Sequence, residues 1–150
     1  MRVKIGFIMA VVLLLGSITV IQAQNNTPVG VWQTIGDQGE NKGKVTSHIR
    51  IYEASNGTLV GTIIQPISNP DGKCHADCPG RLANQPLKGL TIMWGFKHAG
   101  GNVWEGGSIV DPEDGTVYSC KLTVEGNKLQ VRGFVGISLI GRTQTWVRLQ

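Results

Sequence analysis

The chain has 150 residues, which allows for one domain, and a formal net charge of +4 with 41% hydrophobic residues. Two of its cations, Arg2 and Lys4, lie at the extreme N-terminus, and the others form no basic stripe. This distribution argues against a nucleic-acid-binding protein.

The first 23 residues are predicted to form a signal peptide. Arg2 and Lys4 precede an apolar, uncharged run over residues 5–21, and Ala23 supplies the small residue that signal peptidase requires before its cut. A retained transmembrane anchor is the alternative, because the run is close to the shortest that spans a bilayer. Cleavage predicts a mature domain of residues 24–150 that is periplasmic or secreted, with no stable membrane insertion.

The mature chain consists of short runs of β-branched and aromatic residues separated by Gly, Asn, Asp and Pro. Eight strands are predicted, at 29–35, 45–54, 58–65, 90–97, 103–110, 116–124, 128–137 and 143–149. Turn sequences such as Ser55-Asn56-Gly57 and Glu125-Gly126-Asn127 connect them as sequential hairpins. The pattern predicts an all-β fold, an eight-stranded antiparallel up-and-down barrel, with a two-sheet sandwich as the alternative.

A stretch of 24 residues, Pro66–Gly89, breaks the strand rhythm with four prolines and two cysteines. Connections this long are functional or disordered, and the cysteines favour order in an exported chain. We expect this stretch to form an ordered loop, cross-linked by a disulfide, that folds over one mouth of the barrel.

Three cysteines leave the disulfide pairing open. A Cys74–Cys78 bridge would contribute about 2 kcal/mol, and a bridge from either to Cys120 about 4 kcal/mol. Alternation in the sixth strand turns Cys120 inward with Tyr118 and Leu122, which favours Cys74–Cys78.

A zinc site built from Cys74, His75, Cys78 and His98 is disfavoured, because structural zinc sites take a second cysteine or histidine pair. No metal or cofactor is therefore predicted.

The first strand begins with Gly30-Val31-Trp32, and Arg148 lies in the last strand. This pair resembles the opening and closing strands of lipocalins. The resemblance implies a structural role for both residues: the Trp32 indole closes one end of the barrel and Arg148 packs across it, a contact worth roughly 0.5–2 kcal/mol.

A second resemblance covers nearly the whole mature chain. The segments that carry it include 29–32, 48–53, 89–96, 104–107, 118–120 and, most specifically, 131–146. They are similar to an exported bacterial family catalogued as domain of unknown function 2147, which implies a lipocalin-like barrel and assigns no activity. One departure is the spacing of Cys74 and Cys78, which lie farther apart here than the family pattern implies.

No catalytic constellation is recognisable. His48, His75 and His98 lie outside any nucleophile motif, and the acidic residues Asp111, Glu113 and Asp114 fall in a turn, where carboxylates bond the backbone. The chain is therefore predicted not to be an enzyme.

Three aromatic residues, Trp94, Trp104 and Tyr118, are candidates for lining a ligand cavity, with core packing as the alternative for each. The resulting hypothesis is a non-enzymatic binder of a small apolar or amphipathic molecule. The alternative is a cell-envelope interaction protein with a filled barrel and no ligand.

Overall fold

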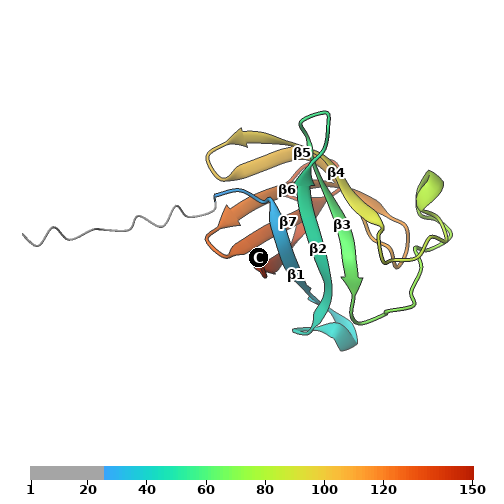
Figure 1. Ribbon diagram of the computed structural model, residues 1–150. Coiled ribbons are helices and arrows are strands. Elements are labelled where there is room, and N and C mark those ends of the chain that lie inside the picture. The colour runs from blue at the N-terminus through green and yellow to red at the C-terminus, as the bar shows by residue number, and fades with distance from the viewer. Residues whose placement is uncertain (1–25) are drawn as a thin grey trace, which may run out of the picture.

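The computed structural model describes residues 26–150, which form a closed barrel of eight antiparallel strands (Figure 1). The strands are β1 (Gly30–Ile35), β2 (Val45–Glu53), β3 (Leu59–Pro66), β4 (Thr91–Gly100), β5 (Val103–Val110), β6 (Val117–Glu125), β7 (Lys128–Phe134) and β8 (Gly141–Arg148). The predicted up-and-down barrel is confirmed. The sandwich alternative is wrong, because β8 pairs with β1 and closes the sheet.

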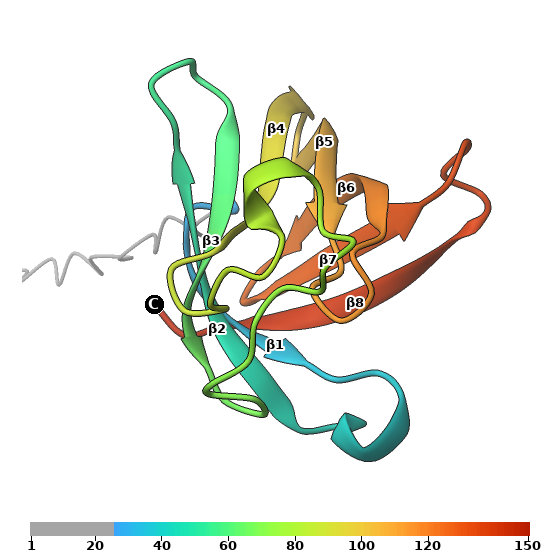
Figure 2. The same cartoon turned by 90° about the vertical axis from the view of Figure 1, so that its right-hand side faces the viewer.

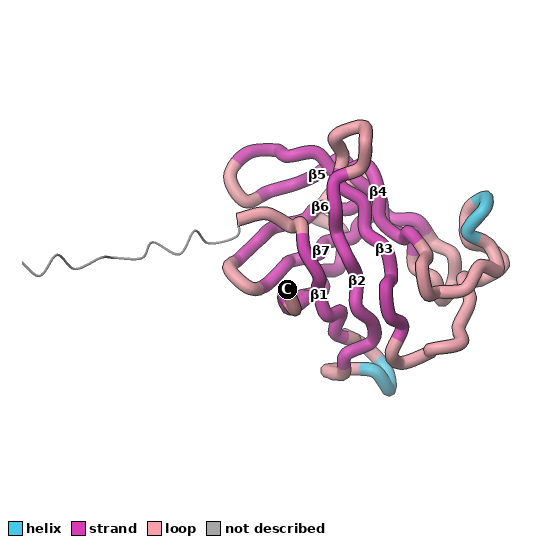
Figure 3. Tube along the Cα trace, in the orientation of Figure 1, coloured by secondary structure: helices cyan, strands magenta, loops and turns pink. Residues whose placement is uncertain are grey.

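The predicted signal peptide, residues 1–23, lies outside the described residues. Within residues 26–150, no helix is long and apolar enough to cross a membrane. Two short 3-10 helices, η1 (Gly39–Asn41) and η2 (Gly80–Leu82), lie in the connections between strands (Figure 3).

The predicted strand boundaries agree with the structure to within a few residues, and the largest differences are at the ends of the fourth and seventh strands. β7 ends at Phe134 rather than at residue 137. The last register pair with β8 is Phe134 with Gly141, and Gly136, with a φ of +78°, lies in the bend that follows the strand. The apolar residues beyond Phe134 therefore belong to a connection.

The core follows from the period-2 alternation of the strands. On β6, Cys120, Leu122 and Val124 are each at most 1% exposed, while the side chains between them face outward. Their neighbours across β7, Val131 and Leu129, are buried as well. The largest fully buried side chains of the barrel are Trp32, Trp146, Phe96, Ile49, Ile51 and Met93.

Antiparallel order sends alternate connections to opposite ends of the barrel. The connections β1–β2, β3–β4, β5–β6 and β7–β8 gather at one end, which we call the mouth (Figure 2). The start of β1 and the end of β8 lie at the other end, which we call the closed end. The longest connection, residues 67–90, lies across the mouth in Figure 2, and we call it the cap loop.

Candidate functional site

The closed end of the barrel is sealed by Trp32 and Arg148. The Trp32 indole is fully buried, and the guanidinium carbon of Arg148 lies 4.2 Å from the centroid of its ring. The Arg148 guanidinium also donates hydrogen bonds to the carbonyl oxygens of Thr27 (2.7 Å) and Val29 (3.0 Å), and Trp32 Nε1 donates to Pro28 O (2.7 Å). Partial burial lowers the pKa of Arg148 from its ordinary value. Arg148 and residues 27–29 therefore cover Trp32, and they leave no entrance for a ligand at the closed end.

The inner wall of the mouth carries both apolar and polar side chains. Tyr118 on β6 pairs in register with Ile109 on β5, and both are partly exposed although they face the barrel axis. Gly133 on β7 lies beside them, and a Cβ there would be in van der Waals contact with Tyr118 Cβ, at 3.5 Å. The apolar part of the wall therefore has accessible surface at the mouth.

A polar network on β8 forms the neighbouring part of this wall, beyond β7. Trp146 Nε1 donates to Gln144 Oε1 (3.2 Å), and Gln144 Nε2 donates to Asp37 Oδ1 (3.1 Å). The other oxygen of Asp37 receives Arg142 Nε at 3.0 Å. Arg142, Gln144 and Trp146 alternate along β8 and so share its inner face, with Trp146 buried and Arg142 half exposed. Polarity thus increases from the core toward the mouth.

Hydroxyl groups continue the polar lining next to Asp37. Thr34 Oγ1 lies 2.6 Å from Thr46 Oγ1 and 2.8 Å from Ser47 Oγ. Thr34 is only 6% exposed, so its hydrogen bonds within this cluster offset the cost of burying the hydroxyl.

The cap loop is ordered by its own bonds and by the mouth beneath it. A disulfide joins Cys74 to Cys78, both sulfurs belong to the buried core, and Cys120 is a free buried thiol. Backbone hydrogen bonds link Cys74 to residues 84 and 85 across the loop. The open question of pairing is thus decided by position, because Cys120 lies inside the barrel wall.

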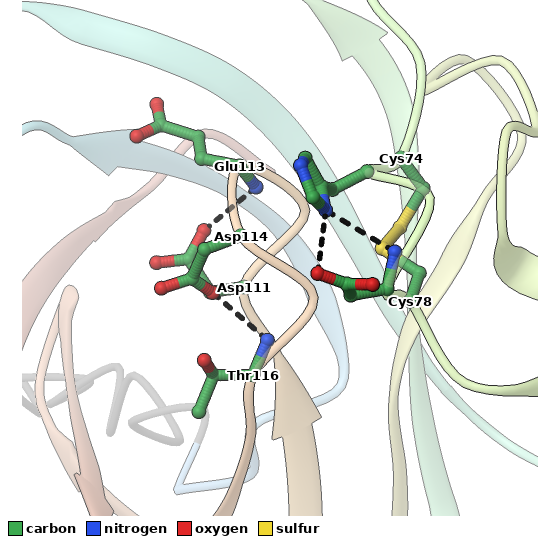
Figure 4. A network of polar contacts seen from close by, with 8 residues as sticks. Cys74, Cys78, Asp111, Glu113, Asp114 and Thr116 are labelled. Atoms are coloured by element: carbon green, nitrogen blue, oxygen red, sulfur yellow. Dashed lines mark hydrogen bonds and ion pairs between the residues drawn. A yellow bond between two sulfur atoms is a disulfide. The ribbon is translucent and has the colours of Figure 1, made fainter.

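The β5–β6 turn, residues 111–116, supports the cap loop from the side (Figure 4). His75 N–H donates to Pro112 O (2.9 Å), and Gly115 lies so close to Asp77 and Cys78 that a Cβ would collide with their backbone. The turn is itself held by carboxylates: Asp111 accepts from the Glu113 amide, and Asp114 from the Thr116 amide. The latter hydrogen bond lowers the pKa of Asp114.

The three aromatic candidates for a ligand cavity are separated by the fold. Tyr118 lies at the mouth. Trp104 is buried near the closed end, where its ring lies 4.6 Å from that of His98. Trp94 pairs with Ser108 on the outer face, because its neighbour Met93 occupies the inward position. Tyr118 is therefore the one member of this trio whose position fits the hypothesis of a ligand in the mouth.

Sequence reasoning did not single out Asp37, Arg142 or Gln144. A signal for two of them was available, because Arg142, Gln144 and Trp146 occupy every second position of the last strand. Asp37 lies in a turn, and nothing local to it predicts that it meets β8.

Catalytic and metal-binding arrangements are not evident in the described part of the chain. No three His, Cys, Asp or Glu side chains of residues 26–150 lie together as metal ligands. Asp111, Glu113 and Asp114 bond backbone groups of their own turn or project into solvent. Two shallow hollows of about 540 and 330 Å³ lie on the outer wall, the first beside Phe134 and the second beside Tyr52.

The fold is lipocalin-like: a closed eight-stranded barrel with one sealed end and one mouth. A solved Helicobacter pylori structure, HP1028, described as belonging to the lipocalin family, has a similar fold, with a TM-score of 0.67 and 24% identity over 81% of this chain and 82% of that one. A family model described as an uncharacterized protein conserved in bacteria (DUF2147) matches residues 30–148, and the chain belongs to this family. No curated protein matches it.

Proposed function

We propose that the protein is an exported, non-enzymatic binder of a small amphipathic molecule, which it holds in the barrel mouth beneath the cap loop. The observation that supports this is the two-part lining of the mouth. Ile109 and Tyr118 offer partly exposed apolar surface, and Arg142 and Gln144, on β8 just beyond β7, offer hydrogen-bond donors beside it. A ligand with an apolar body and a polar end satisfies both parts.

The depth of the site is limited by the packed core. Trp146, Leu122 and Phe96 are each at most 2% exposed, so a ligand would rest on top of them and not pass between them. The cap loop would then cover its outer side. This geometry favours a small ligand over a long chain threaded through the barrel.

The proposal is tested by native mass spectrometry of protein purified from the periplasm of a Gram-negative host. Export predicts a mature chain beginning at residue 24, and binding predicts a co-purifying small molecule. Recovery of the uncleaved chain in membranes would contradict export.

Binding is tested separately with anilinonaphthalene sulfonate, an amphipathic anion. We expect Tyr118→Ala to weaken its binding several-fold, because the phenol contributes one of the large exposed apolar surfaces of the mouth. The chain's other tyrosine supplies a matched control: Tyr52 lies on the outer wall and is 41% exposed, so Tyr52→Ala should leave binding unchanged. If both substitutions weaken binding equally while the near-ultraviolet circular dichroism is unchanged, the probe binds outside the mouth.

A further inference from the structure

The connection between β7 and β8, residues 135–140, exposes four large aliphatic side chains. Val135 is 67% exposed, Ile137 58%, Leu139 85% and Ile140 70%. Every other exposed large hydrophobic residue within residues 26–150 is at most 44% exposed. We call these four side chains the aliphatic tip. The β7–β8 connection that carries the tip stands out from the rim of the mouth, clear of the cap loop (Figure 2).

Backbone groups of the tip are already hydrogen-bonded within the protein. Arg132 Nε donates to Ser138 O (2.6 Å), and Arg132 Nη2 donates to Leu139 O (3.3 Å). Ile140 N–H donates to Ile137 O (3.1 Å), which makes the tip a tight turn. An unpaired carbonyl is costly in an apolar phase, and these bonds remove that cost for three carbonyls and one amide.

Arg132 also fixes the tip to the sheet, since its Nη1 donates to Thr143 Oγ1 on β8 (3.0 Å). One guanidinium therefore ties β7, the tip and β8 together. The aliphatic side chains are presented on a braced turn, which reduces the entropy lost when they are immobilised at a surface.

The charges around the tip favour an anionic surface. Two cations, Arg132 and Arg142, lie near the ends of the two strands that carry the tip, and residues 126–150 contain neither Asp nor Glu. Asp37 pairs with Arg142, whereas Arg132, at the base of the tip, bonds only uncharged oxygens. On the outer wall beside Ile137, Lys121 and Glu105 line the hollow of about 540 Å³ with opposite charges. The base of the tip is therefore positive on balance.

We propose that the aliphatic tip docks the protein on an anionic phospholipid surface. The four side chains enter the boundary between headgroups and acyl chains, and Arg132 remains at the level of the phosphates. The attachment is peripheral and reversible, because the tip is far too short to span a bilayer. This attachment is a function separate from ligand binding in the mouth, and it does not depend on that binding.

Flotation of the protein with vesicles tests the proposal. Vesicles of phosphatidylcholine mixed with phosphatidylglycerol are compared with vesicles of phosphatidylcholine alone. We expect binding to the anionic vesicles, weakened by salt, and a loss of roughly tenfold or more in the Leu139→Gln/Ile140→Gln variant, because two inserted aliphatic chains are removed. Both residues are exposed in the free protein, so the unfolding midpoint should not change.

Leu149→Gln is the matched control, since Leu149 is an exposed leucine (44%) at the closed end. It should bind vesicles like the natural chain.

Absence of binding to anionic vesicles, equal binding to neutral vesicles, or equal binding of the double variant and the natural chain would each overturn the proposal. Concentration-dependent dimers that the double variant abolishes, without vesicle binding, would assign the tip to a second copy and overturn it too. Anilinonaphthalene sulfonate binding in the mouth should stay the same in the double variant, which separates this result from the proposed function.

Discussion

At the scale of single residues, Gly30 explains why glycine precedes the tryptophan that closes the barrel. Its φ is +141°, and a Cβ there would lie 2.6 Å from Gln150 O and 2.8 Å from Arg148 Nη1. The guanidinium can cover the Trp32 ring only because residue 30 has no side chain. The Gly-x-Trp pattern thus has a steric cause.

This cause predicts the effect of Gly30→Ala. The substitution should destabilise the protein by about 1–3 kcal/mol more than a control, since it adds a clash to the backbone strain. Gly57→Ala is that control: Gly57 also has a positive φ (+79°), but open space surrounds it. Urea unfolding of both variants measures the difference, and equal losses would show that the collision with Arg148 is relieved at no cost.

The buried Cys120 thiol affects how the free energy of unfolding depends on pH. Burial raises its pKa from 9.0 to about 12. Between these values the unfolded chain loses the thiol proton while the folded chain keeps it, so this group lowers the free energy of unfolding as pH rises from about 9 to 12.

We therefore expect Cys120→Ala to show a shallower loss of stability across this alkaline range than the natural chain. Denaturant titrations at several pH values measure both slopes, and other titrating groups cancel in the comparison. Identical slopes would mean that the thiol is solvated in the folded protein. The cavity left by alanine lowers stability at every pH and does not alter the slope.

At the scale of elements, the cap loop depends on its contact with the β5–β6 turn. The disulfide closes a short ring and so orders only the centre of the loop. Its position over the mouth depends on Cys74 and Cys78, which are buried in the core. The turn adds the His75–Pro112 hydrogen bond and the close approach of Gly115 to Cys78. Cap loop and turn therefore act as one unit.

Gly115→Ala should separate the cap loop from the turn while the barrel stays folded. The added Cβ collides with the backbone of Asp77 and Cys78, in a residue whose φ is +80°. Hydrogen exchange of the His75 amide should accelerate, because that amide loses its acceptor at Pro112. Gly126→Ala, at a positive φ with no neighbour within 4 Å, is the control and should leave this amide protected. Unchanged protection in Gly115→Ala would contradict the coupling.

At the scale of the whole molecule, the barrel is closed by a short seam. Only two register pairs join β1 to β8, Trp32 with Arg148 and Gln33 with Val147. Side chains lengthen this seam at both ends: Arg148 covers Trp32 at the closed end, and Asp37 bonds Gln144 and Arg142 at the mouth. The polar network of the candidate site is thus also part of what closes the barrel.

Local patterns in the sequence were sufficient to predict the positions of the strands and their order in the barrel. Alternation assigned Cys120, Leu122 and Val124 to the core, and turn residues such as Asn56-Gly57 marked the hairpins. These features depend on neighbours close in the chain, and such neighbours can be read from one sequence. The seventh strand was predicted too long, since the β-branched residues Val135 and Ile137 follow its last residue, Phe134.

The candidate site, in contrast, was decided by the tertiary structure. Asp37 meets Gln144 across 107 residues of sequence, and their contact exists only once β8 pairs with β1. Trp94 and Tyr118 both lie on strands and are both aromatic, yet bulges in the sheet and its register turn one outward and the other toward the mouth. The sequence by itself determined a barrel with one tryptophan-sealed end. Closure of the sheet decided which side chains line the mouth, because strand register and long-range pairing depend on the whole barrel.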